Sequence, residues 1–175
     1  MYLVLRGCTE DMIKLLNFFG KDKYSDADAV EDVIKYIAKE GNKEKAPYTY
    51  GVVCGGMYET AIKDFNRIHS LFCKNPLTKI RHFVIAPANA YSPELLVQWM
   101  VRLGDMFDSS CLGNAYQMYF AVHVDRPIPH IHFALNPISY DTGVGFYCDE
   151  KMIDHMLEAI TEVTEQEVQY AIKYK

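Results

Sequence analysis

The segment from residue 123 to residue 136, HVDRPIPHIHFALN, most constrains how this chain can fold. It contains three of the six histidines. His130 and His132 alternate with apolar residues, and residues two apart in a strand point to the same face of a sheet. The short, proline-rich turn before His130 predicts a hairpin, which brings His123 back beside the other two imidazoles.

Three converging imidazoles are typical of a divalent-metal site. Neutral imidazoles suit Zn²⁺, Mn²⁺, Co²⁺ or Ni²⁺, and three protein ligands leave positions for a substrate oxygen and water. An isolated H-x-H pair is more often structural, but the third histidine favours a metal here. Asp125 lies two residues from His123, so it either orients an imidazole or serves only in the turn.

The composition is that of a folded globular protein. The 175 residues, half of them hydrophobic, can bury one sizeable core but not two ordinary ones, so we expect a single domain. No apolar run approaches the ~20 residues of a membrane helix, and the start of the chain does not resemble a signal peptide. The five cysteines form no C-x-x-C pair. We therefore expect reduced cysteines and a cytoplasmic protein.

The net charge of −5 argues mildly against a nucleic-acid partner. The charges are unevenly distributed, however. Residues 149–167 are strongly acidic, whereas residues 35–45 and 63–81 are locally basic.

The hydrophobic pattern predicts an α+β fold with a largely antiparallel central sheet and helices packed on it. The histidine hairpin is expected at the centre of the sheet, on a face open to solvent. Strands are expected at residues 1–8, 48–54, 80–87, 116–122 and 130–135. Helices are expected at residues 9–19, 26–40, 57–73 and 92–107, and from Asp149 towards the C-terminus.

The order of these motifs resembles that of the relaxases, the MobA-like mobilisation nucleases of conjugative plasmids and integrative elements, within the HUH endonucleases. His130-Ile131-His132 is similar to their H-hydrophobe-H motif, and His123-x-Asp125 to the histidine and acid upstream of it. Residues 133–136, ending in asparagine, resemble the strand that follows. Residues 32–41, DVIKYIAKEG, resemble the tyrosine helix of the family, and residues 81–94 its middle motif. Ile128 stands where some members carry a further histidine.

The resemblance covers nearly the whole chain and implies metal-dependent, strand-specific nicking of single-stranded DNA at a transfer origin. A tyrosine would attack the phosphodiester and leave a 5′-phosphotyrosyl enzyme. Tyr36 is the nucleophile that it implies, with Tyr24 and Tyr48 as fallback candidates. The ion would be Mn²⁺ or Mg²⁺, with Zn²⁺, Co²⁺ or Ni²⁺ as alternatives, and accessory mobilisation proteins would be partners.

Further residues have roles under this resemblance. His82 is expected to support a metal ligand from behind, although a buried histidine bonded to the backbone explains it nearly as well. Candidates for DNA phosphate contacts are Lys35, Lys39, Arg81 and Arg126, each also explained as a solvated charge. Full-length relaxases commonly carry a further C-terminal region, so residues 1–175 are expected to be one nuclease domain, isolated or minimal.

Other functions remain open. A rolling-circle replication initiator shares this chemistry but usually places its tyrosine after the H-x-H, where Tyr170 and Tyr174 stand. A small three-histidine metalloenzyme acting on a small molecule explains the acidic charge better but gives Tyr36 no role. A degenerate relaxase-like protein would bind DNA or a partner without cutting.

Overall fold

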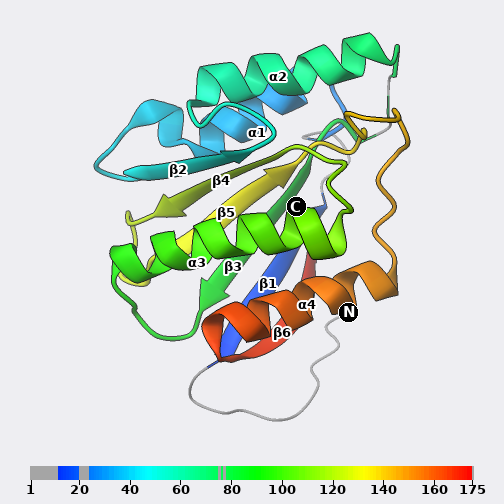
Figure 1. The fold of residues 1–175 in the computed structure, drawn as a ribbon. Helices are drawn as coiled ribbons and strands as arrows, with labels where there is room; N and C mark the ends of the chain where they lie inside the picture. Colours follow the sequence, from blue (N-terminus) through cyan, green and yellow to red (C-terminus); the bar gives the residue numbers. More distant parts are fainter. Residues whose placement is uncertain (1–11, 20–23, 75, 77, 175) are drawn as a thin grey trace.

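The computed structural model describes residues 12–19, 24–74, 76 and 78–174. In this part of the chain, six strands form one sheet in the order β2-β4-β5-β3-β1-β6 (Figure 1). Every neighbouring pair is antiparallel except β1 and β6, which run parallel. The strands are β1 (Met12–Phe19), β2 (Tyr48–Val52), β3 (Arg81–Pro87), β4 (Met118–His123), β5 (His130–Leu135) and β6 (Glu167–Tyr174). The predicted α+β class is confirmed, and the β4–β5 hairpin lies within the sheet.

Helices cover both faces of the sheet. They are α1 (Ala29–Ile37), α2 (Tyr58–Leu71), α3 (Pro93–Met106) and α4 (Glu150–Thr164), with a 3₁₀ turn at Lys39–Gly41 and a π-helical turn at Phe107–Cys111. α3 and α4 lie on one face, and α1 and α2 on the other (Figure 1). α1 packs over β4 and β5, and α2 packs on α1. Among the described residues, each helix is too short or too polar to cross a lipid bilayer.

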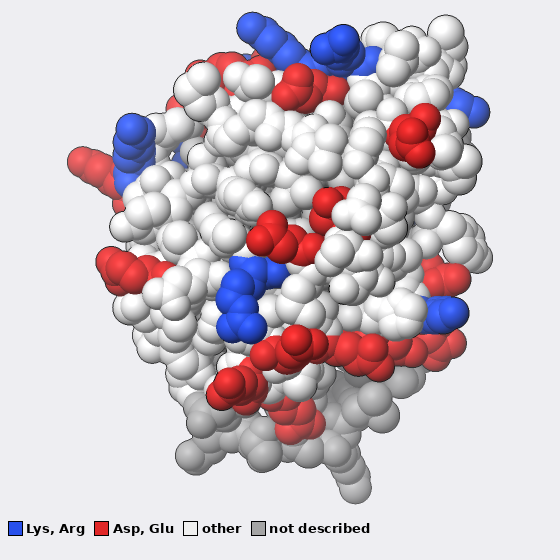
Figure 2. All heavy atoms as spheres, viewed as in Figure 1, with Lys and Arg blue, Asp and Glu red and all other residues white. Residues whose placement is uncertain are grey.

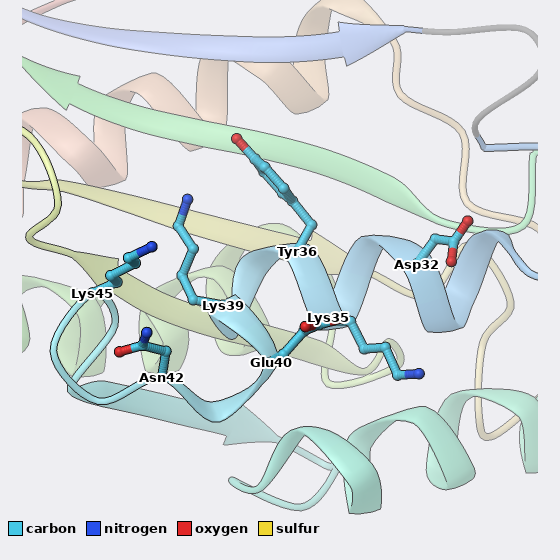
Figure 3. A pocket seen from close by; sticks show the side chains of 7 residues that line it. All are labelled: Asp32, Lys35, Tyr36, Lys39, Glu40, Asn42 and Lys45. Atoms are coloured by element: carbon cyan, nitrogen blue, oxygen red, sulfur yellow. The ribbon is translucent and has the colours of Figure 1, made fainter.

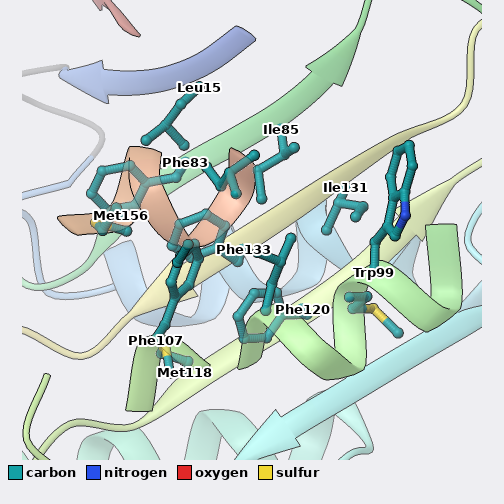
Figure 4. Close-up of a cluster of buried hydrophobic side chains, with 14 of the residues drawn as sticks. Leu15, Phe83, Ile85, Trp99, Phe107, Met118, Phe120, Ile131, Phe133 and Met156 are labelled. Atoms are coloured by element: carbon teal, nitrogen blue, oxygen red, sulfur yellow. The ribbon is translucent and has the colours of Figure 1, made fainter. Parts of the chain in front are cut away.

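The larger core lies between the sheet and the α3–α4 layer. Phe133 is its centre, because its ring stacks on Phe83 at 4.8 Å and on Phe120 at 5.1 Å between centroids. Figure 4 shows Phe107 of the helical layer beside Phe133, and Trp99 at the Ile131 end of the cluster. The alternation of β5 puts Ile131, Phe133 and Leu135 on this side and the histidines on the other.

The smaller core holds α1 on the histidine face. Val33, Ile34 and Ile37 of α1 are almost fully buried, as the helical spacing predicts. Opposite them, the strands present two small side chains, Ala121 and Ala134, both fully buried. Small side chains under a helix let its backbone approach the sheet closely, which matters for the site described below.

The prediction of a helix at residues 9–19 is wrong for its described part, because Met12–Phe19 is the strand β1. The run MIKLLNFF is too short for its apolar residues to distinguish a helix from a strand. Its state is decided by tertiary pairing, antiparallel to β3 and parallel to β6. Ile13 and Leu15 enter the larger core, whereas Lys14 is exposed on the other face. The strand predicted at residues 1–8 lies outside the described residues.

The predicted C-terminal helix is correct at its start and too long at its end. Asp149 caps α4 by accepting a hydrogen bond from the Met152 amide at 2.8 Å. The helix ends at Thr164, because Glu165 adopts the left-handed conformation, with φ 56°. The chain then forms β6, whose Val168 and Tyr170 both pack against the larger core, as residues two apart in a strand can.

We expect Phe133→Ala to lower the free energy of unfolding by about 3–5 kcal/mol, because it leaves a cavity among three aromatic rings. Urea unfolding followed by circular dichroism measures this change. Tyr147→Ala is the control, since Tyr147 is 78% exposed, and its effect should stay within about 0.5 kcal/mol. Equal losses in the two variants would contradict this account of the core.

Candidate metal centre and active site

The β4–β5 hairpin brings three imidazoles together on the face that carries α1. His123 is the register partner of His130, and His132 lies two residues further along β5. One ring nitrogen from each histidine lies within 4.8 Å of the others. The residues are only 1%, 9% and 4% exposed, respectively. The expected open face is therefore wrong for this position, because α1 covers the hairpin.

Hydrogen bonds leave one ring nitrogen of His123 and one of His130 for a metal. The Nε2–H of His123 donates to the carbonyl of Ile37 at 2.6 Å, so its Nδ1 carries the lone pair. The Nδ1–H of His130 donates to the carbonyl of Ile128 at 3.1 Å, so its Nε2 carries the lone pair. Both rings are thereby held in one tautomer, as metal-binding imidazoles usually are.

His132 is supported by a side chain. Its Nδ1 lies 2.8 Å from Nε2 of His82, on the neighbouring strand β3. The two rings are nearly parallel, with centroids 5.1 Å apart. His82 thus lies beside a candidate ligand, within hydrogen-bond distance of its second ring nitrogen.

Burial keeps the three imidazoles neutral. Burial, with a smaller contribution from the positive charge of Lys39, outweighs the bond to Ile37 and lowers the pKa of His123 to about 4. Burial also lowers the pKa of His130, and it lowers that of His132 well below the ordinary value, with the neighbouring imidazoles adding to the shift. Neutral imidazoles keep the lone pairs that a metal needs, so this donor set fits a divalent ion.

Tyr36 lies beside the imidazoles, near the end of α1. Its ring centroid is 5.6 Å from that of His132, 5.8 Å from His82 and 6.1 Å from His123, in edge-to-face geometry each time. Figure 3 shows its hydroxyl pointing away from the helix, towards β3. Tyr36, at the margin of the buried side of α1, thus lies beside His123, which is nearly ninety residues away in the sequence.

Lys39 connects this helix to the hairpin turn. Its Nζ lies 4.9 Å from the Tyr36 ring centroid and 3.0 Å from a carboxylate oxygen of Asp125. Burial raises the pKa of Asp125, but the hydrogen bond and charge of Lys39 outweigh this and hold the pKa below its ordinary value. The Asp125 carboxylate thus pairs with a lysine, whereas the imidazoles of His123 and His130 bond to backbone carbonyls.

A cavity of about 650 Å³ opens beside the cluster, over β3 and β1. Tyr36, His130 and His132 line one side of it. The floor is apolar, from Leu16, Val84, Ala86 and Pro87, and the hairpin turn adds Arg126, Pro127 and Ile128. The cavity thus joins a tyrosine hydroxyl, two imidazoles and an apolar floor in one space.

The comparison with protein families supports this geometry. The family model described as "Relaxase: MobA/VirD2-like, nuclease domain" matches residues 36–169. This chain belongs to that relaxase family. The match begins at Tyr36 and spans all three histidines. A comparison with curated proteins gave no match.

Two of the basic residues predicted to contact DNA lie away from the cavity of this relaxase. Arg81 is on β3 with Phe83 and Ile85, so it points to the α3–α4 face, where Cys148 and Tyr170 lie near its charge. Lys35 is ion-paired with Glu31 one helical turn earlier. Figure 3 shows its side chain directed away from that of Tyr36.

Two lysines near the site were missed by sequence reasoning. Lys14 is exposed on the histidine face of β1, opposite Ala86 of the cavity floor. The misassigned helix at residues 9–19 concealed it, because only a strand places Lys14 on that face. Lys45 and Lys39 line a second pocket, beside the end of α1, together with Tyr36 (Figure 3). The Lys45 carbonyl accepts a hydrogen bond from the Val124 amide at 2.8 Å.

A row of acidic residues lies on the other side of the sheet from the imidazoles. Glu150, Asp154, Glu158 and Glu162 recur every four residues along α4, so they form one stripe. Figure 2, which views the α3–α4 face, shows this row of acidic side chains. This acidic row is thus separated from the imidazoles and Tyr36 by the thickness of the sheet.

The buried imidazoles predict a pH dependence for the metal-free protein. The pKa of His123 falls from 6.5 to about 4 on folding, so between these values the unfolded chain binds the proton more readily. The free energy of unfolding should therefore fall as the pH drops from about 6.5 to 4. At about 1.4 kcal/mol per pKa unit, His123 alone accounts for up to about 3 kcal/mol. Urea unfolding with a chelator present measures it.

His123→Gln should flatten this dependence, since the variant lacks the buried imidazole. His155→Gln, on α4, is the matched control and should keep the wild-type slope. A wild-type stability that does not change between pH 6.5 and 4 would show that the imidazoles are not held neutral.

Proposed function

We propose that this relaxase nicks single-stranded DNA at a transfer origin, at one site on one strand, with Tyr36 as the nucleophile. His123, His130 and His132 hold a divalent ion, Mn²⁺ or Mg²⁺ in the first place. The observation that carries the proposal is the packing of the Tyr36 ring against His123 and His132, two of the three neutral imidazoles, beside an open cavity. The family match supports the reaction class.

The chemistry follows from the weakness of a phenol as a nucleophile near neutral pH. A bound cation would withdraw charge from the oxygens of the scissile phosphate. Tyr36 Oη forms the bond to phosphorus, the P–O3′ bond breaks, the phenolic proton leaves and the 3′ oxygen gains one. The phosphotyrosyl ester keeps the bond energy, so a 3′-hydroxyl can reverse the step and rejoin the strand.

The charges suggest how the strand approaches. Arg126 lines the cavity, and Lys14 and Lys39 are near its ends, so phosphates would find cations on both sides of an apolar floor. Ile128, which is 39% exposed, offers an apolar surface to a base. Lys35 and Arg81 are not among the proposed DNA contacts, because their side chains point away from the cavity.

The rolling-circle alternative needs a tyrosine after the H-x-H. Tyr170 is on β6 and packs against the core of the α3–α4 face, away from the histidines. Tyr36 therefore suits the chemistry better. We assign residues 1–175 to one nuclease domain acting in the cytoplasm, with accessory mobilisation proteins as its further partners.

Tyr36→Phe should abolish the covalent protein–DNA adduct. The phenyl ring keeps the packing on the imidazoles but lacks the attacking oxygen. The measurement is an SDS gel shift after incubation with Mn²⁺ and labelled single strands from the genomic neighbourhood of the protein. The adduct should also disappear from the wild-type reaction when a chelator is added, because three imidazoles alone do not polarise the phosphate.

The control is Tyr147→Phe, an exposed tyrosine on the loop before α4, which should form the adduct at the wild-type level. An adduct that survives in Tyr36→Phe would remove Tyr36 from the mechanism. No adduct with any strand tested, for the wild type, would overturn the proposed nicking activity.

Arg126→Ala should weaken binding to single-stranded DNA and reduce its salt dependence. Each phosphate contact contributes about 0.7 to the slope of log K against log salt on single strands. Fluorescence anisotropy with a labelled oligonucleotide at several salt concentrations measures this slope. Lys151→Ala on the acidic face is the matched control and should leave the slope unchanged. An equal change in both variants would contradict the proposed path.

A further inference from the structure

A chain of hydrogen bonds continues behind His132 and ends at Tyr24. Nε2 of His82 lies 2.8 Å from Nδ1 of His132, and Nδ1 of His82 lies 3.2 Å from the Tyr24 hydroxyl. The three residues are only 4–5% exposed. The chain therefore connects a candidate metal ligand to a tyrosine that the mechanism does not use.

The direction of these bonds follows from what a metal ligand needs. His132 offers its Nε2 lone pair only if its proton is on Nδ1. The Nδ1–H then donates to Nε2 of His82, so the proton of His82 is on its Nδ1. That proton needs an acceptor in a buried place, and the oxygen of Tyr24 provides it.

We propose that Tyr24 is a positioning residue, which accepts the Nδ1–H of His82 and so fixes the tautomer in which His132 presents Nε2 to the metal. The inference rests on the metal site of the proposed function. Without the acceptor, His82 would favour the tautomer with its proton on Nε2. His132 would then accept a hydrogen bond from that Nε2–H at its Nδ1 and carry its own proton on Nε2, where the metal would bind.

Tyr24 is held in place for this task. Its carbonyl accepts a hydrogen bond from the Lys79 amide at 2.6 Å, just before β3 and His82. Its side chain belongs to the small core under α1. Burial, and then the nearby Tyr36, raise the pKa of Tyr24 to about 12, so the hydroxyl remains protonated and is a poor nucleophile. The fallback role considered for Tyr24 from sequence thus gives way to a positioning role.

The groups that accept hydrogen bonds from the three imidazoles carry no charge. The imidazoles of His123 and His130 donate to backbone carbonyls, and His132 donates to a second imidazole. Carboxylate partners, which are common behind metal-binding histidines, add negative charge to a site. Neutral hydrogen-bond partners would instead leave the full positive charge of a bound cation available to polarise the phosphate.

The first test needs no variant. Long-range ¹H–¹⁵N spectra of the metal-free wild-type protein report which imidazole nitrogen carries each proton. We expect Nδ1–H for both His82 and His132. An Nε2–H tautomer at His132 would overturn the proposal.

The second test compares Tyr24→Phe with Tyr119→Phe. Both variants remove a buried hydroxyl from the same small core, but Tyr119 has no ring contact or hydrogen bond to the imidazoles in the described part of the chain. We expect the Mn²⁺ dissociation constant, from titration calorimetry, to rise about tenfold in Tyr24→Phe, at the low end for partners behind a ligand. It should stay at the wild-type value in Tyr119→Phe.

Tyr24→Phe should also move the His132 proton towards Nε2 in the same spectra, a change that loss of packing alone would not cause. Unchanged Mn²⁺ affinity and an unchanged tautomer would overturn the positioning role. If the wild type binds neither Mn²⁺ nor Mg²⁺, the proposed nuclease mechanism fails, whereas the tautomers of His82 and His132 still decide the proposal about Tyr24.

Discussion

The site depends on one hydrogen bond, from Nε2–H of His123 to the carbonyl of Ile37 at 2.6 Å. Ile37 is the last residue of α1 and directly follows Tyr36. The bond therefore fixes the tautomer of a candidate ligand and the position of the candidate nucleophile at once. The C-terminal end of a helix carries partial negative charge, which favours a cation close by. A helix that packed against another part of the sheet would provide neither.

Packing explains why α1 comes close enough for this bond. Ala121 and Ala134 lie under the helix. Ala121 is the register partner of His132, and Ala134 is that of Tyr119. Beyond Ile37 the helix does not continue, since Lys39 and Glu40 both have positive φ, 51° and 52°. A positive φ costs energy in residues other than glycine, and such a conformation tends to persist where surrounding contacts hold it. Here the ion pair of Lys39 with Asp125 is one such contact.

Sequence reasoning found the features that rest on local pattern. The period of two around His130 and His132 predicted the hairpin, and the helical period of Val33, Ile34 and Ile37 predicted α1. It failed where pairing between distant segments decides the structure, as in β1 and β6, which pair with each other across about 150 residues of sequence. It identified His82 through a resemblance. No sequence pattern places the Tyr24 hydroxyl on that ring, because the contact joins a loop to a strand 58 residues away.

The net charge of −5 illustrates why a total can mislead about partners. A β-sheet separates two surfaces, and the electrostatic field near each surface is set mainly by the charges within about 10 Å of it at ordinary salt. The acids of α4 lie behind the larger core, whereas Lys14, Lys39 and Arg126 lie around the cavity. An acidic row on α4 and basic residues around the cavity are compatible with a DNA strand on the cavity side of the sheet only. The same separation would disfavour a strand that approached over α4, so under the proposed function the acidic row directs DNA to the opposite face.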